Sequence, residues 1–232
     1  MHRLLILFMT ITLGALSLPA RELTKYEIKV GDFSELKVTD GVNVDYRCSA
    51  DSAGYAVFTC RSEVVSALIL STSGRKLNIQ VSTEDVRLSD LPRITVYSRY
   101  LVKAVNAGDS MLRVLDVAGC PKFEASLEGN GSLVVRDIKA GDLKGVLKLG
   151  HGNLVITGEC EKAKIISVGT GTIEADGLKV AEETVKVSGT GSVGVWATEK
   201  LSVFGMGSTT VYYKGNPEIK NRTLGIKVVP LQ

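Results

Sequence analysis

A Gly-x-Gly pair returns roughly every 20 residues through the second half of this chain, a period typical of solenoid repeats. The first glycines of the five clear copies are Gly129, Gly150, Gly169, Gly189 and Gly205. A degenerate copy begins at Gly108, and 18 of the 24 glycines fall between residues 105 and 215. Glycine therefore follows the repeat rather than general loop content. In a solenoid each repeat forms one turn of the stack.

Alternating apolar residues follow each glycine pair. Examples are Leu133/Val135, Leu154/Ile156 and Val193/Val195. A period of two is typical of a half-buried strand, and glycine at a corner permits positive φ and close backbone stacking. The repeat therefore predicts an all-β fold, namely a single-stranded right-handed parallel β-helix with coils of about 20 residues.

An antiparallel β-sandwich is the main alternative, because it also places short strands between turns. Its turns usually recur about every 8–12 residues, and they need not repeat the same residues. The phase-locked return of the glycine pairs across five copies favours the solenoid.

Residues 22–104 have strand patterns without the glycine pairs. The strands predicted there are Leu36–Val38, Val42–Tyr46, Ala67–Leu70, Leu77–Val81 and Ile94–Tyr97. Open solenoid ends expose unpaired strand edges that need covering. We therefore expect an N-terminal cap with irregular first coils over residues 21–104, glycine-punctuated coils over 105–217, and a C-terminal cap or tail over 218–232.

The N-terminal segment, residues 1–20, has the pattern of a signal peptide. His2 and Arg3 form a short basic region, and the run Leu4–Leu18 is almost wholly apolar. A membrane-spanning helix needs about 20 apolar residues, so this shorter run better suits a cleaved leader. We place the cleavage after Ala20, with Ser17 as the second choice and an uncleaved anchor as the alternative. The protein is thus expected in the periplasm, on the outer surface or secreted.

Charge and hydropathy argue against a nucleic-acid partner and against a membrane span after the leader. Without residues 1–20, the chain has 27 Lys and Arg against 25 Asp and Glu, a net charge near +2. These charges are spread evenly along the sequence, without a basic cluster that contains interleaved aromatic residues. This pattern argues against a nucleic-acid partner. No later segment is apolar enough to predict a transmembrane helix.

All four cysteines lie after the predicted leader, where disulfides can persist. If the runs around Cys48 and Cys60 form a hairpin centred near Gly54, their thiols face each other; a disulfide and two free thiols are both consistent with this. Cys120 and Cys160 lie two coils apart at the period of the repeat. Coils spaced by about 4.8 Å would separate their Cα atoms beyond the roughly 7 Å that a disulfide tolerates. We expect these two to be buried thiols.

We assign no catalytic, cofactor-binding or metal-ligating residues from the sequence. His151 is the only histidine after the predicted leader, and its position between two glycines suits an exposed corner. Without a close CxxC or HxH spacing, a zinc site would need an unusual ligand set. The glycine pairs do not predict phosphate loops, because no helix follows them.

A polysaccharide lyase or hydrolase of the pectinase-like β-helix type is the second hypothesis. Its chemistry would need paired carboxylates, or acids with calcium and a basic residue. Asp116, Asp137 and Asp176 follow different corners, and the first two could stack on one face beside Arg136 and Lys139. Polar residues at solenoid turns are ordinarily only solvated, so we expect no enzyme activity.

Three short motifs follow one another in a fixed order. They are Asp40-Gly41-Val42-Asn43-Val44, Ser188-Gly189-Thr190-Gly191-Ser192 and Tyr213-Lys214-Gly215-Asn216-Pro217. Together they resemble the head GIN domain family of auto-transporter adhesins, exported Bacteroidetes-type proteins, over about residues 28–220. The chain departs from that pattern at Val42, where isoleucine is usual, and where bulkier residues replace serine, at Glu128, Leu149, Val168 and Phe204. The resemblance implies an exported parallel β-helix with a binding role and brings no catalytic residues or cofactor.

We therefore expect an exported, non-enzymatic, adhesin-like envelope protein that contacts an extended glycan or a cell-surface protein. A rigid stack presents long faces on which outward residues form ladders. Thr170 and Thr190 would form one such ladder, and Trp196, Tyr212 and Tyr213 could stack on a sugar, although packing against the core better suits Trp196. Self-assembly into a homo-oligomer through the solenoid ends is the third hypothesis.

Overall fold

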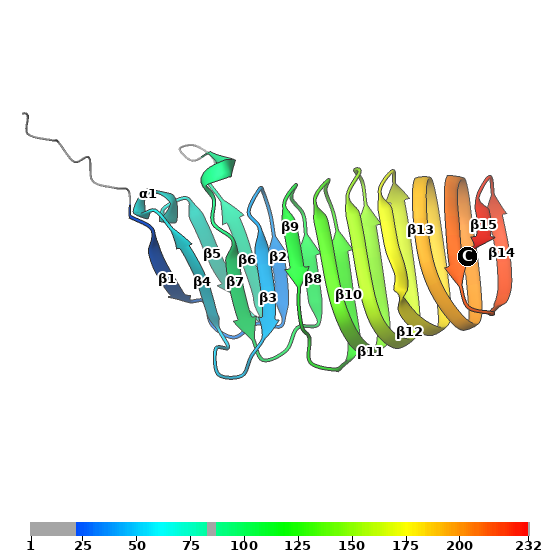
Figure 1. Ribbon diagram of the computed structural model, residues 1–232, viewed down its shortest axis with the longest axis horizontal. Coiled ribbons are helices and arrows are strands. Elements are labelled where there is room, and N and C mark those ends of the chain that lie inside the picture. The colour runs from blue at the N-terminus through cyan, green and yellow to red at the C-terminus, as the bar shows by residue number, and fades with distance from the viewer. Residues whose placement is uncertain (1–21, 83–86, 232) are drawn as a thin grey trace, which may run out of the picture.

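The computed structural model describes residues 22–82 and 87–231, which form an elongated β-solenoid of about 6 turns (Figure 1). Its strands belong to one 15-stranded sheet that winds around the long axis, and successive coils pair in parallel. This confirms the predicted parallel β-helix. The expected signal peptide, residues 1–20, lies outside the described residues. Within them, no helix is long and apolar enough to cross a membrane.

The coils build two long faces. Face A contains residues 122–128 and the positions in register with them; its strands are β6 (Lys76–Val81), β2 (Glu35–Val38), β8 (Lys103–Asn106), β10 (Cys120–Leu127), the second parts of β11 (Ser132–Lys148) and β12 (Asn153–Gly169), parts of β13 (Thr172–Lys214), and β14 (Glu218–Leu224). Face B contains β7 (Ile94–Ser98), β3 (Val44–Cys48), β9 (Met111–Val114), the first parts of β11 and β12, other parts of β13, and β15 (Lys227–Pro230). The long strands bend at the corners and so serve both faces.

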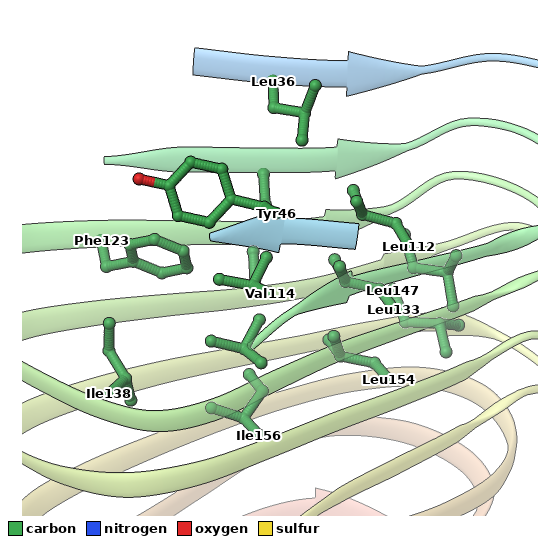
Figure 2. Packing of buried hydrophobic residues seen from close by; sticks show 14 of the residues in the cluster. Leu36, Tyr46, Leu112, Val114, Phe123, Leu133, Ile138, Leu147, Leu154 and Ile156 are labelled. Atoms are coloured by element: carbon green, nitrogen blue, oxygen red, sulfur yellow. The ribbon is translucent and has the colours of Figure 1, made fainter. Parts of the chain in front are cut away.

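The core is a set of inward ladders between the two faces. Leu112 pairs with Leu133, and Leu133 with Leu154, so one leucine from each of three coils lies above the next (Figure 2). All three are fully buried. Burying a leucine side chain is worth about 2 kcal/mol, so each coil gains most of its stability from its two neighbours.

The glycine repeat sets where coils approach most closely. Its last copy, Gly205 and Gly207, does not stack glycine for glycine on the pair before it. On face A, Leu127 pairs with Leu147 and Leu147 with Ser167, which gives coils of the predicted length. Gly205, however, lies over Val187, and Gly207 lies over Gly189. The last glycine pair is therefore displaced by two positions from its expected match, because this coil is shorter by two positions on face A than the coils before it. The next coil keeps that shorter length, with Gly225 over Gly207.

The first coil in the sequence is not the first in the stack. β2 and β3 pair on one side with β6 and β7, which come later in the chain, and on the other with β8 and β9. The corner between β2 and β3 joins these neighbours: Asp40 Oδ2 accepts a hydrogen bond from the Val81 N–H at 3.1 Å, and Asn43 Oδ1 accepts one from the Met111 N–H at 3.0 Å. The Asp40–Asn43 motif is thus a structural corner that fastens three coils.

Antiparallel strands close the N-terminal end (Figure 1). β1 (Thr24–Lys29) pairs with β4 (Tyr55–Cys60), β4 pairs with β7, and β5 (Leu68–Ser73) forms a hairpin with β6. A short helix, α1 (Ser62–Val65), joins β4 to β5, and a 3-10 turn, η1 (Leu88–Asp90), precedes β7. The five strands predicted in this third of the chain overlap β2, β3, β5, β6 and β7.

The hairpin expected around Cys48 and Cys60 is wrong. β3 and β4 do not pair with each other, because β7 lies between them. Cys48 therefore pairs with Ser98, while Cys60 pairs with Thr24 at the outer edge. Both thiols are free. Their separation could not be judged from the sequence, since the strand that lies between them begins only at Ile94, after two further strands and a helix.

The C-terminal segment, expected as a cap or tail over 218–232, forms one more coil over its described residues. β14 and β15 each pair in parallel with β13. The inward positions of β14 include Asn221 and Thr223 in place of the aliphatic residues of the earlier coils. Polar residues there reduce the apolar surface that the last coil exposes.

The glycine corners can be tested by adding a single methyl group. Gly189 has a φ of +138°, and a Cβ there would lie 2.1 Å from the Gly169 carbonyl oxygen. We expect Gly189→Ala to lower the free energy of unfolding by at least about 2 kcal/mol, because it adds backbone strain and a clash between coils. Gly119→Ala is the control, since its Cβ would meet only the Lys139 carbonyl oxygen at 3.8 Å. Equal urea midpoints for the two variants would contradict the assigned corner geometry.

Candidate functional site

Charged side chains form two neighbouring ladders on the outer surface of face A. In the first, Lys122 is followed in register by Asp142, Lys162 and Glu182. In the second, Lys103 is followed by Glu124, Lys144, Lys164 and Thr184. Adjacent positions in each ladder are about 4.8 Å apart, the spacing of neighbouring strands.

The two ladders are the walls of a groove that crosses several coils. Its volume is about 720 Å³, and it extends from Glu35 and Lys103 at one end to Thr184 and Lys186 at the other. The groove crosses the strands and runs along the solenoid axis. Its length follows the stacking direction, so an elongated molecule would fit it better than a compact one.

The charges at the N-terminal end of the groove neutralise one another. Glu124 forms ion pairs with Lys103 at 3.3 Å and with Lys144 at 3.2 Å. Burial alone would raise the pKa of Glu124, but the hydrogen bonds and charges of Lys144 and Lys103 outweigh it and hold that pKa below its usual value. Lys162 and Lys164, one coil further on, form no ion pair with any described residue. Two unpaired cations therefore line the middle of the groove.

Face A as a whole is strongly basic. Its outward positions hold 12 basic residues, Lys37, Lys76, Lys103, Lys122, Lys144, Lys148, Lys162, Lys164, Lys186, Lys200, Lys220 and Arg222. They hold 6 acidic residues, Glu35, Glu124, Glu128, Asp142, Glu182 and Glu218. Since the chain has 28 basic and 25 acidic residues, the remainder has 16 and 19. Face A thus has a net charge of +6 and everything else −3.

The even spread of charge along the sequence is therefore misleading about the surface. Coiling brings Lys144 and Lys164 side by side, although a full coil of sequence separates them. These residues form no cluster along the sequence, because neighbours in the ladders of face A lie a full coil apart in the chain. The signal that could have found them is lysine recurring at the coil period.

The charged cluster on face B has a structural role instead. Asp45 accepts hydrogen bonds from Arg113 Nε at 2.7 Å and from Arg93 Nη1 at 3.0 Å. Burial would raise the pKa of Asp45, but the two guanidinium groups hold it below its usual value. The three residues come from β3, β9 and the segment before β7, so this cluster joins three adjacent coils.

The aspartates considered for catalysis have separate surroundings. Asp116 accepts hydrogen bonds from Arg47 and from the Cys48 N–H. Asp176 forms an ion pair with Lys214 at 2.9 Å. The Asp137 amide donates to Thr157 Oγ1 at 3.1 Å, and Thr157 comes from the coil between those of Asp137 and Asp176. Both Asp116 and Asp176 thus have structural partners of their own.

The other candidates lie outside the groove. Thr170 Oγ1 donates to the Gly150 carbonyl at 3.1 Å and lies 2.8 Å from His151 Nδ1, at an exposed corner. Thr190 is also exposed, Trp196 is half-buried, and Tyr212 is 37% exposed. Tyr213 packs against the core.

Cys120 and Cys160 belong to one ladder, with Ala140 between them, as the coil spacing predicts. Cys160 is buried, and Cys120 is partly buried against the core. Burial raises the pKa of the Cys160 thiol to about 12. Among the described residues, no group of three or more His, Cys, Asp or Glu could hold a metal ion.

The sequence comparison identifies the family. The family described as "Putative auto-transporter adhesin, head GIN domain" matches residues 32–217. The chain belongs to this family. All three motifs of the sequence lie within the matched residues. No curated protein matches the chain.

Solved structures of several bacterial proteins have the same fold. A "putative adhesin" from Bacteroides fragilis superposes with a TM-score of 0.80 at 20% identity, covering 91% of this chain and 97% of its own. A "putative adhesin" from Parabacteroides merdae gives 0.72 at 18% identity, covering 91% and 97%. A "putative lipid binding protein" from Parabacteroides distasonis gives 0.70 at 19% identity, covering 90% and 97%. At these identities the likeness establishes the fold.

One ionisable side chain lies inside the core beneath face A. Glu183 pairs in register with the inward Ala163 and is 2% exposed, and neither of its carboxyl oxygens has a hydrogen-bond partner among the described residues. Burial raises its pKa to about 8, so this carboxyl is largely neutral at pH 7. The nearby Cys160 thiol is neutral as well.

Glu183 should make the stability of the protein fall as pH rises. Its pKa is near 4.5 when unfolded and about 8 when folded, so the folded state holds the extra proton, and its stabilising effect is lost between these pH values. We expect Glu183→Gln and Glu183→Met to gain stability relative to wild type from pH 5 to pH 9, by roughly 5 kcal/mol at most. Urea unfolding at several pH values measures this. Parallel curves for wild type and both variants would contradict the buried neutral carboxyl.

Proposed function

We propose that this protein is an exported, non-enzymatic binding protein of the cell envelope that holds an extended acidic glycan along the groove of face A. The observation that supports this most directly is the pair of unpaired lysines, Lys162 and Lys164, in a groove that follows the solenoid axis. Family membership supports a binding role, and the leader-like N-terminus supports export.

The ligand class follows from the spacing and sign of the charges. Lys144 and Lys164 lie one coil apart, at a separation of about 4.8 Å, so a chain whose carboxylates have a similar spacing can meet both lysines. Lys122 and Asp142 form an ion pair at 3.5 Å, and acidic residues alternate with the lysines at the ends of the groove. This mixed pattern suits a chain of hydroxyls and carboxylates better than a uniformly charged phosphate backbone.

Binding without turnover is the better interpretation of the aspartates. A glycoside hydrolase needs two carboxylates on either side of one bond, and a lyase of this type needs acids with calcium and a basic residue. Asp116 and Asp176 instead have structural partners, Arg47 and Lys214, and neither lines the groove.

Binding can be measured with oligogalacturonides as the acidic probe and dextran as the neutral one. Lys162→Gln combined with Lys164→Gln should weaken oligogalacturonide affinity about tenfold, because two charge contacts of roughly 0.7 kcal/mol each are lost. The affinity of wild type should fall with added salt. Isothermal titration gives both results.

The matched control is Lys179→Gln combined with Lys227→Gln, which removes the same charge from exposed positions outside face A. An equal loss in the control would show that only net charge matters, and this would contradict a site on face A. Tighter binding of dextran would contradict the acidic ligand class.

Two further measurements address the rest of the proposal. Incubation with polygalacturonate should release no product; release by wild type that Asp137→Asn abolishes would establish the lyase or hydrolase instead. Cell fractionation should place the protein in the envelope or the medium. Recovery with cytoplasmic markers would contradict export.

A further inference from the structure

Apolar side chains occupy outward positions on face A beyond the charged groove. In the register of the sheet, Val146 pairs with Ile166, and Met206 pairs with Leu224. Val168 is 38% exposed, Met206 63% and Leu224 74%. Outward positions of a solenoid face solvent and are ordinarily polar, so apolar residues that recur there in several coils indicate a candidate binding surface.

Two of these residues, Ile166 and Val168, line a second groove, the apolar groove. Its volume is about 330 Å³, and it is lined by Ile166, Val168, Lys186, Ser188, Phe204 and the neighbouring backbone. The side chains of Ile166, Val168 and Phe204 give this groove its apolar lining.

A cation lies at the junction of the two grooves. Lys186 pairs in register with Ile166 and lines both the apolar groove and the charged groove. Arg222 pairs with Phe204 on the other side. Neither Lys186 nor Arg222 forms an ion pair with any described residue. Among the described residues, Lys186 and Arg222 thus leave unpaired positive charge beside the apolar side chains of Ile166 and Phe204.

We propose that the apolar groove binds a single acyl chain with an anionic headgroup, the chain lying against Ile166, Val168 and Phe204 and the headgroup lying beside Lys186. This goes beyond the proposed glycan binding and does not depend on it. A carboxylate or phosphate headgroup complements the charge of Lys186 and Arg222, and the hydrocarbon chain covers the exposed side chains.

The charge pattern favours this occupant over a purely apolar one. A neutral apolar surface pressed onto the groove would bury the Lys186 ammonium without a partner, which is costly. A second copy of this chain would bring its own basic face A into contact, placing lysine against lysine. An anionic amphiphile satisfies the cation and covers the apolar surface with one molecule.

Dodecanoate is a suitable probe, used below its micelle concentration and measured by isothermal titration. Butyrate has the same headgroup with a short chain, and dodecyl maltoside has the same chain with a neutral headgroup. We expect dodecanoate to bind at least about tenfold more tightly than either, because both the apolar and the charged contact contribute.

The variants separate the two contacts. Ile166→Ser combined with Phe204→Ser should weaken dodecanoate binding at least about tenfold through lost apolar area. Lys186→Gln should weaken dodecanoate several-fold while leaving dodecyl maltoside unchanged. Val134→Ser combined with Val155→Ser, at half-buried outward positions of face B, is the matched control and should bind as wild type does. Circular dichroism and thermal melts confirm that each variant is folded.

Three results would overturn the proposal. The first is dodecanoate binding no tighter than butyrate or dodecyl maltoside. The second is an equal loss in the face B control. The third is concentration-dependent dimerisation that Phe204→Ser abolishes while dodecanoate fails to bind, which would assign the groove to a second copy. The double variant Lys162→Gln/Lys164→Gln separates the two proposals. It should lose oligogalacturonide binding and keep dodecanoate binding, because it changes only the charged groove.

Discussion

The closest approach between coils, at the glycine corners, is the constraint on which the rest of the solenoid depends. A Cβ at Gly189 or Gly207 would lie 2.1 Å from the carbonyl oxygen of the coil below. With glycine at these positions, the strands on both faces can reach hydrogen-bonding distance together. Because every coil turns at the same corner, the in-and-out alternation of side chains keeps its phase from one coil to the next.

Coil length is adjusted where this phase would otherwise be lost. On face B, Leu133 pairs with Leu154, which lies 21 positions later in the chain. On face A, Leu127 pairs with Leu147, which lies 20 positions later. The coil is therefore one position longer when it is measured on face B. The extra position is absorbed in a register shift between Val135 and Ile138. The last coils are shorter by two positions on face A, an even number that leaves inward and outward positions unchanged. Irregularities are thus confined to corners, and the ladders stay continuous.

The sequence predicts what depends on local period and misses what depends on pairing order. The glycine repeat and the Leu133/Val135 alternation predicted coils and strands correctly, because each is encoded within one repeat. The insertion of β7 between β3 and β4 was not predictable, since no short-range signal says which later strand will pair with Val44–Cys48. The sequence also matched Gly205 to Gly189, because both are the first glycine of a pair. Strand register decides which residues stack, and it places Gly207 over Gly189.

The same register that stacks inward leucines also stacks outward lysines, so the basic face A is a consequence of the fold. Two like charges about 4.8 Å apart repel by about 0.9 kcal/mol in water. At the N-terminal end of the groove Glu124 offsets this by lying between Lys103 and Lys144. Lys144 and Lys164 are direct neighbours, and no acid separates them. That repulsion remains in the free protein and disappears when an anion binds between them. The alternation of acids and lysines is thus interrupted at Lys164. An anionic ligand gains more by binding there than beside a lysine that an acidic neighbour already neutralises.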